Sequence, residues 1–142
     1  MGKKRIVKKG GESGATGAAS SSRSGKRKMD TGVLYVEATY NNTKVSLTDD
    51  RGGVVTWSSS GSLGFAGAKK GTPFAAAKVG ELIGERAAGM GVKEVSVVVS
   101  GVGAGRESSI RAFATKGIHI NSIKDTTPVP HNGPRAPKAR RV

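Results

Sequence analysis

Glycines at positions 101, 103 and 105 are followed by Arg106, and this group could bind phosphate. It comes directly after an apolar run with valines at 95, 97, 98 and 99. Glycine lets the backbone approach a ligand closely, and a helix that begins here would offer free N–H groups to an anion. Three interpretations stay open: a dinucleotide site, a turn that only packs a strand against a helix, and a turn that binds a nucleic-acid backbone. Arg106 stands where the dinucleotide fingerprint needs a small residue, which favours the nucleic-acid backbone.

Acidic residues could in principle bind metal or act in acid–base catalysis. The adjacent pair Asp49 and Asp50 lies beside two glycines, with no third acid at ligand spacing, and this pattern is typical of a turn. Hydrolysis of a phosphodiester with two metals would need several converging carboxylates, and Asp49, Asp50, Glu107 and Asp125 are scattered along the chain. The absence of cysteine excludes thiolate sites and disulfides, and two histidines are too few for zinc. We therefore expect that the chain has no catalytic residue, no metal site and no cofactor, and that it is not an enzyme.

Basic residues are concentrated at the two ends of the 142-residue chain. The whole chain has 24 Lys and Arg against 10 Asp and Glu, a formal charge of +14. Residues 1–30 hold nine basic and two acidic residues, and residues 128–142 hold four basic and no acidic ones. Such blocks are typical of arms that bind a polyanion, although a merely solubilising tail has the same composition.

Targeting segments bear on the cellular location of the chain. The sequence has no apolar run of about 18 residues, and its N-terminus lacks the apolar stretch of a secretory signal. Residues 13–24 are rich in Ser, Ala and Gly, as in a transit peptide, but the lysine cluster at residues 3–9 fits a nucleic-acid arm better. We expect a cytoplasmic location over an organellar one.

The first half of the folded region reads as an antiparallel meander with strands at residues 33–40, 43–48 and 54–58. Asn41 and Asn42 predict a hairpin turn, because asparagine tolerates positive φ. A glycine-rich loop at 59–71 ends in Thr72 and Pro73, an N-cap followed by the first helical residue. The helix has an apolar stripe and two internal glycines, which indicate close packing on the sheet or on a partner. The stripe comprises Ala75, Val79, Ile83, Ala87 and Met90, the internal glycines are Gly80 and Gly84, and Gly89 and Gly91 end the helix.

The second half predicts a buried strand at 95–99, a helix at 107–116 with Gly117 after it, and a last strand at 118–123. The continuous valines favour a central strand covered on both faces. Together these elements predict an α/β fold: a mixed five-stranded sheet built from the meander and two right-handed β-α-β crossovers, with the last three strands parallel. Residues 1–30 are expected to form a disordered basic arm, 31–127 the folded domain, and 128–142 a proline-stiffened basic arm.

Four motifs in this order carry a resemblance to a known family. They are residues 38–43 (ATYNNT), 70–76 (KGTPFAA), 103–112 (GAGRESSIRA) and 127–133 (TPVPHNG), followed by basic residues to Val142. From about residue 32 to the end, the chain resembles the family of the eleventh protein of the small ribosomal subunit, in its bacterial or organellar form. The resemblance implies a ribonuclease-H-like fold without nuclease activity. It also implies binding to small-subunit ribosomal RNA in the platform, beside other ribosomal proteins and near the messenger-RNA exit path, in support of subunit assembly and translation.

Charge, turn chemistry and the resemblance together give the expected RNA-binding residues. These are Lys3, Lys4, Arg5, Lys26, Arg27, Lys28, Asn41, Asn42, Thr43, Lys69, Lys70, Gly71, Thr72, Gly103, Gly105, Arg106, Arg111, His131, Asn132, Arg135, Lys138, Arg140 and Arg141. The expected partners are small-subunit ribosomal RNA and neighbouring ribosomal proteins, with messenger RNA nearby and no membrane or small-molecule substrate. A nucleoid or RNA-chaperone protein that binds through its tails alone is the remaining alternative. As a separate hypothesis, the pair Asn132-Gly133 is chemically suited to isoaspartate formation.

Overall fold

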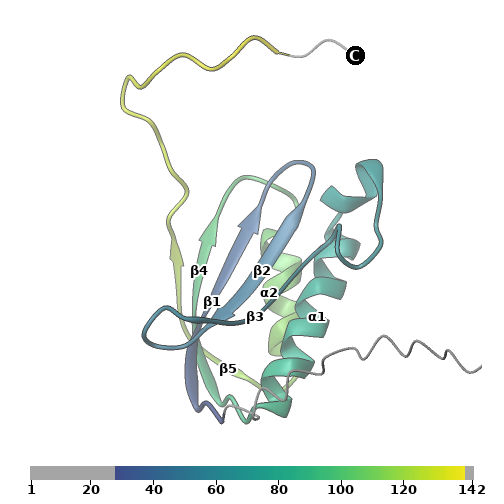
Figure 1. The fold of residues 1–142 in the computed structure, drawn as a ribbon, viewed down its shortest axis with the longest axis vertical. Coiled ribbons are helices and arrows are strands. Elements are labelled where there is room, and N and C mark those ends of the chain that lie inside the picture. The colour runs from purple at the N-terminus through teal and green to yellow at the C-terminus, as the bar shows by residue number, and fades with distance from the viewer. Residues whose placement is uncertain (1–27, 140–142) are drawn as a thin grey trace, which may run out of the picture.

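The computed structural model describes residues 28–139, which form one sheet and two long helices (Figure 1). The elements are β1 (Thr31–Ala38), β2 (Thr43–Thr48), β3 (Val54–Ser59), the short 3-10 helix η1 (Gly67–Gly71), α1 (Pro73–Gly89), β4 (Glu94–Ser100), α2 (Arg106–Ala114) and β5 (His119–Asp125). Each predicted strand and helix is present, with ends displaced by no more than two residues. The sequence did not predict η1, which lies inside the glycine-rich loop.

The five strands form one mixed sheet in the order β3-β2-β1-β4-β5. The first three strands pair antiparallel, whereas β4 pairs parallel with both β1 and β5. The predicted α/β class and mixed sheet are confirmed. The last three strands run in the same direction, but β3 is not a neighbour of β4. The crossover through α1 passes over the whole meander, so that β1 lies at the centre of the sheet and β3 at its edge.

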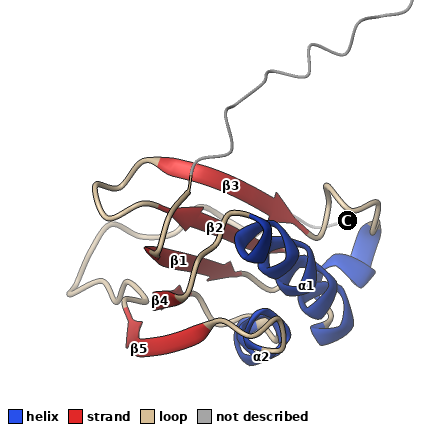
Figure 2. Ribbon diagram, turned by 90° about the horizontal axis from the view of Figure 1, so that it is seen from below, coloured by secondary structure: helices blue, strands red, loops and turns tan. Residues whose placement is uncertain are grey.

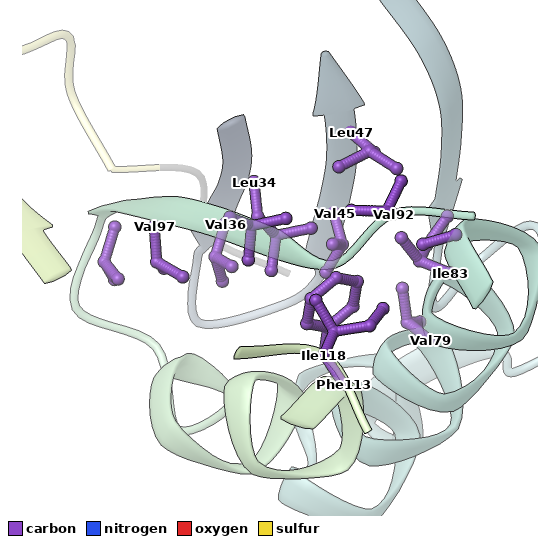
Figure 3. Packing of buried hydrophobic residues seen from close by; sticks show 13 residues of the cluster. Leu34, Val36, Val45, Leu47, Val79, Ile83, Val92, Val97, Phe113 and Ile118 are labelled. Atoms are coloured by element: carbon purple, nitrogen blue, oxygen red, sulfur yellow. The ribbon is translucent and has the colours of Figure 1, made fainter. Parts of the chain in front are cut away.

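Both long helices lie on the same face of the sheet (Figure 2). Alternate side chains from β1, β2 and β4 point toward them and meet Val79 and Ile83 of α1 and Phe113 of α2 in the core (Figure 3). The prediction that β4 is covered on both faces is therefore wrong. Val95, Val97 and Val99 are buried, but Val98 points to the other face and is only half-buried. Buried and half-buried residues alternate along β4, as in a strand that is covered on one face only. The sequence does not show this alternation, because the half-buried position 98 is also a valine.

The internal glycines of α1 serve a contact between the two helices. A Cβ at Gly80 would lie 2.2 Å from the Ser109 carbonyl oxygen of α2, so no larger residue fits without moving a helix. The sequence predicted that these glycines pack closely on the sheet or on a partner. In the structure, Gly80 packs against α2 instead. Ala75, Val79, Ile83 and Ala87 form the predicted buried stripe.

Met29, the second described residue, packs against the core, and its backbone N–H donates to the Met90 carbonyl oxygen at 3.3 Å. Asp30 accepts from the Lys93 backbone N–H at 2.9 Å. The expectation that residues 1–30 form a disordered arm therefore does not hold for Met29 and Asp30, because the methionine side chain is long enough to reach the core. Residues 1–27 and 140–142 lie outside the described part of the chain.

The acidic pair forms a turn, as predicted. The Asp49 carboxylate accepts from the backbone N–H groups of Arg51 at 3.0 Å and Gly53 at 2.7 Å. Asp50 accepts from the Thr31 hydroxyl at 2.7 Å, which ties the turn to the start of β1. Both carboxylates thus have structural partners between β2 and β3.

Candidate nucleic-acid interface

Three loops from distant parts of the sequence meet at one end of the sheet, where β1 and β4 end and β2 begins (Figure 1). We call this region the loop end: the turn at residues 39–42, η1 with Thr72, and the turn at residues 101–105. Three of the motifs that carry the resemblance contribute to it. The fourth, residues 127–133, leaves the domain from the same end, because β5 runs parallel to β4.

Glycines allow these loops to touch backbone to backbone. A Cβ at Gly71 would lie 2.1 Å from the Tyr40 carbonyl oxygen, and one at Gly103 would lie 2.2 Å from the Thr39 carbonyl oxygen. The Gly103 N–H also donates to the Ala38 carbonyl oxygen at 3.0 Å. Gly71 and Gly103 therefore act by fixing the positions of their neighbours, and each loop holds the next in place.

The asparagine turn is closed by Thr39, which sequence reasoning missed. The Thr39 N–H donates to the Asn42 carbonyl oxygen at 2.8 Å, and the Asn42 N–H donates to the Thr39 hydroxyl at 3.1 Å. Neither Asn41 nor Asn42 has positive φ, contrary to the expectation for a tight hairpin, because the loop has four residues and needs no left-handed conformation. Asn41 is exposed, whereas the side chain of Thr43 is buried below the turn.

The basic residues of the loop end, Lys69 and Lys70, lie in the last turn of η1. Lys69 is exposed and Lys70 half-buried, and neither forms an ion pair with any residue in the described range 28–139. Thr72 caps α1 as predicted, since its hydroxyl accepts from the Ala75 N–H at 3.3 Å and donates to the Lys69 carbonyl oxygen at 2.7 Å. The cap thereby fixes η1 to the helix, and two lysine ammonium groups are left for an external anion.

Arg106 forms a clamp between the glycine turn and the start of the C-terminal arm. Its guanidinium donates to the Gly101 carbonyl oxygen, to the Thr127 hydroxyl at 3.2 Å and to the Asp125 carboxylate at 2.5 Å. Hydrogen bonds from the Thr127 hydroxyl and N–H, together with Arg106, lower the pKa of Asp125 from 3.8 to about 2. Asp125 is therefore ionised at neutral pH, and the ion pair fixes the point where the arm leaves the domain.

This clamp changes how Arg106 can contribute. The sequence assigned Arg106 to a phosphate, whereas the structure gives its guanidinium three internal acceptors. In this conformation Arg106 acts on the turn and on the arm rather than as a free cation. An RNA phosphate would have to share the guanidinium with Asp125.

The remaining expected residues are spread over several regions. Arg111 lies on α2, 3.4 Å from the Glu107 carboxylate, and borders a groove of about 420 Å³ between α1 and α2. Lys28 lies before β1, at the opposite end of the sheet from the loops. The exposed arm carries the residues His131, Asn132, Arg135 and Lys138, and Asn132 has a φ of 51°. The residues Lys3, Lys4, Arg5, Lys26, Arg27, Arg140 and Arg141 lie outside the described residues.

Aromatic residues near the loop end were not among the expected RNA-binding residues. Tyr40 is 78% exposed and Phe74 is 64% exposed. The Phe74 ring packs edge-on against Phe65 with centroids 6.1 Å apart, and the Lys78 ammonium lies 5.6 Å from its centroid. Exposed rings beside lysines are a common surface for stacking unpaired bases. Phe74 could have been noticed in the sequence, because it follows Pro73 and lies off the buried stripe.

The described residues contain neither a cluster of metal-binding side chains nor a helix that could span a membrane. Between residues 28 and 139, no group of three or more His, Cys, Asp and Glu side chains could hold a metal ion. In the same range, neither helix has the length and apolar character needed to span a bilayer.

Comparison with known proteins gives consistent matches. A family model described as "Ribosomal protein S11" matches residues 32–141. The chain is 52% identical over 117 residues to "Small ribosomal subunit protein uS11" of Solibacter usitatus, covering 82% of this chain and 87% of the relative. It is 55% identical over 120 residues to "Small ribosomal subunit protein uS11c" of Chlorokybus atmophyticus, covering 84% and 92%. It is 50% identical over 129 residues to uS11 of Thermosynechococcus vestitus, covering 88% and 99%.

Proposed function

The chain belongs to the ribosomal protein S11 family of the small ribosomal subunit, and from this premise we propose that its loop end and C-terminal arm bind small-subunit ribosomal RNA. Its role in the ribosome is structural, and it is not an enzyme. The resemblance inferred from the four sequence motifs is thereby confirmed.

One observation carries the RNA proposal: the loops that contain the motifs converge at one end of the domain, and the basic arm starts at that same end. Lys69 and Lys70 supply cations that form no ion pair with the described residues, and Tyr40 and Phe74 supply exposed rings. Phosphate contacts give affinity without sequence preference, and stacked bases add to it. A preformed surface of this kind loses little entropy on binding.

The proposal extends to the place of the chain in the subunit. We infer that it lies in the platform, near the messenger-RNA exit path and beside other ribosomal proteins, and supports subunit assembly and translation. We assign the basic segments 1–30 and 128–142 as arms around the RNA-binding domain 31–127, except that Met29 and Asp30 join the domain. A ribosome in the cytoplasm is proposed over an organellar one.

Co-sedimentation tests this function directly. Tagged full-length chain, expressed in cells, should sediment with 30S particles through a sucrose gradient at high salt. A variant with Lys69→Ala and Lys70→Ala should be washed off at lower salt than the unmodified chain. If both proteins were released at the same low salt, binding would depend on the tails alone, as in an RNA chaperone, and the proposal would be wrong.

A further inference from the structure

We propose that the face of the sheet turned away from the helices is a docking surface for a neighbouring small-subunit protein that presents apolar, uncharged side chains. We call this surface the open face. The inference rests on the proposed function, because it assumes that the chain is assembled into the subunit. It concerns the face of the sheet rather than the loops of the loop end, and Asn42 lies where the two surfaces meet.

The open face has a continuous row of side chains across all five strands. The strand register places Trp57 opposite Ser46, Ser46 opposite Tyr35, Tyr35 opposite Val98, and Val98 opposite Lys124. Neither long helix covers this row, because both lie on the other side of the sheet (Figure 2). The row is therefore continuous across the sheet, and its only charged member, Lys124, is at the β5 edge.

The large apolar members of this surface are exposed to solvent. Trp57 is 53% exposed, Tyr35 is 39% exposed, and Val54, on the same strand as Trp57, is 58% exposed. Trp57 is the one tryptophan of the chain. Contiguous exposed apolar side chains on a soluble protein mark interaction surfaces, and tryptophan and tyrosine are the residues that most often dominate binding energy at protein interfaces.

The open face is hollowed beside the tryptophan, and the strand that carries the tryptophan is bonded to α1. A depression of about 360 Å³ is lined by Asn42, Lys44, Ser46, Val54, Trp57 and Ser59. From the other side of the sheet, the Arg86 guanidinium of α1 donates to the Thr56 hydroxyl at 3.1 Å and to the Trp57 carbonyl oxygen at 3.3 Å. These bonds hold the strand that carries the indole, so the depression is a preformed pocket for an aliphatic or aromatic side chain.

Charge favours a protein over RNA as the occupant. The strand positions of the open face carry two lysines and two glutamates, namely Lys44, Lys124, Glu37 and Glu94, so their formal charges cancel. Glu37 and Lys44 lie directly opposite each other. Most of the +14 of the chain lies in segments 1–30, with nine basic and two acidic residues, and 128–142, with four basic and none acidic, so the neutral face contrasts with these basic segments. An RNA backbone would gain nothing from a neutral face, whereas cores of protein interfaces are depleted of charge.

Site-specific cross-linking identifies the occupant. The photoreactive residue p-benzoylphenylalanine is placed at position 57 in full-length chain, and 30S particles assembled in cells are purified and irradiated. We expect an adduct with another small-subunit protein. An adduct with ribosomal RNA, an adduct with a second copy of this chain, or no adduct would each overturn the proposal.

The matched control uses the same photoreactive residue at position 74, an exposed aromatic position at the loop end. Here the expected adduct is with ribosomal RNA. Failure at position 74 alone would count against the RNA-binding function, and failure at position 57 alone against the docking surface, so the two proposals are distinguishable.

A substitution gives an independent readout. Trp57→Ser with Val54→Thr should leave the circular dichroism spectrum and the affinity for ribosomal RNA unchanged, because both side chains are exposed and belong to β3 rather than to the loops of the loop end. Quantitative mass spectrometry of purified subunits should show that the cross-linked neighbour is retained about tenfold less well under a salt wash. Trp57→Phe should restore retention. Unchanged retention in the double variant, or a loss of RNA affinity equal to that of the lysine variant, would overturn the proposal.

Discussion

The loop end and the open face are built on the same strands but differ in charge and in construction. At the loop end, glycines press three loops together and leave Lys69 and Lys70 without ion pairs among the described residues. On the open face, paired strands hold Trp57 and Tyr35 in one row with balanced charges. Under the two proposals, a small domain separates an RNA surface from a protein surface by using strand ends for one and a strand face for the other.

The largest expected effect comes from breaking the loop end itself. Gly103→Ala would place a Cβ 2.2 Å from the Thr39 carbonyl oxygen, in backbone that cannot move without opening the loop end. We expect a loss of about 2 kcal/mol or more in the free energy of unfolding, measured by urea denaturation. The control is Gly89→Ala, because nothing lies within 4 Å of a Cβ at that helical position. Equal stability of the two variants would show that the loops are not held by backbone contact.

Removing the arm should separate binding from folding. Truncation after Pro130 deletes the exposed basic segment and spares every strand and helix of the domain. Cooperative unfolding should persist, whereas incorporation into 30S particles should fall severalfold because Arg135, Lys138 and the terminal arginines are gone. The measurement is the yield of tagged chain in the 30S peak. If the truncated chain were incorporated at the yield of the full chain, the arm would not contribute to binding, and this part of the proposal would be wrong.

A smaller effect is expected at the clamp, and it depends on pH. The pKa of Asp125 in the fold is about 2, below its usual 3.8, so its contribution to stability is full above pH 3.8 and is lost as the pH falls through 2. Asp125→Asn should lower the thermal midpoint modestly at pH 7, and the difference from the unmodified chain should shrink as the pH falls from 4 to 2. A difference that is constant over this range would mean that the carboxylate charge does not stabilise the clamp.

The smallest effect is expected at the asparagine turn. Asn42→Gly keeps the backbone hydrogen bonds to Thr39, since these use the Asn42 N–H and carbonyl oxygen. The turn should therefore remain, and the affinity for ribosomal RNA, measured by filter binding, should fall by severalfold if the Asn42 side chain contacts RNA. Unchanged affinity would assign this residue to the turn alone.

The sequence predicted the elements because their signals are local. Thr72 followed by Pro73 identifies a helix start, and strict alternation at residues 43–48 identifies a strand, without information about the rest of the chain. The strand order and the one-sided helices are not local. They depend on which strand pairs with β4, and that strand is β1. Because Val98 is apolar although it lies on the uncovered face, the sequence of β4 did not show that one of its faces is open. The candidate residues were identified by type, but the convergence of their loops and the internal partners of Arg106 required the structure.

The salt dependence of RNA binding tests the division between the two surfaces most directly. Two variants of equal net charge are compared: Lys69→Ala with Lys70→Ala at the loop end, and Lys44→Ala with Lys124→Ala on the open face. The dependence of log affinity for ribosomal RNA on log salt should flatten by about 1.4 to 1.8 in the loop-end variant, since each lost phosphate contact contributes about 0.7 to 0.9. The open-face variant should keep the slope of the unmodified chain. Equal flattening in both variants would contradict the account, because RNA would then contact both surfaces.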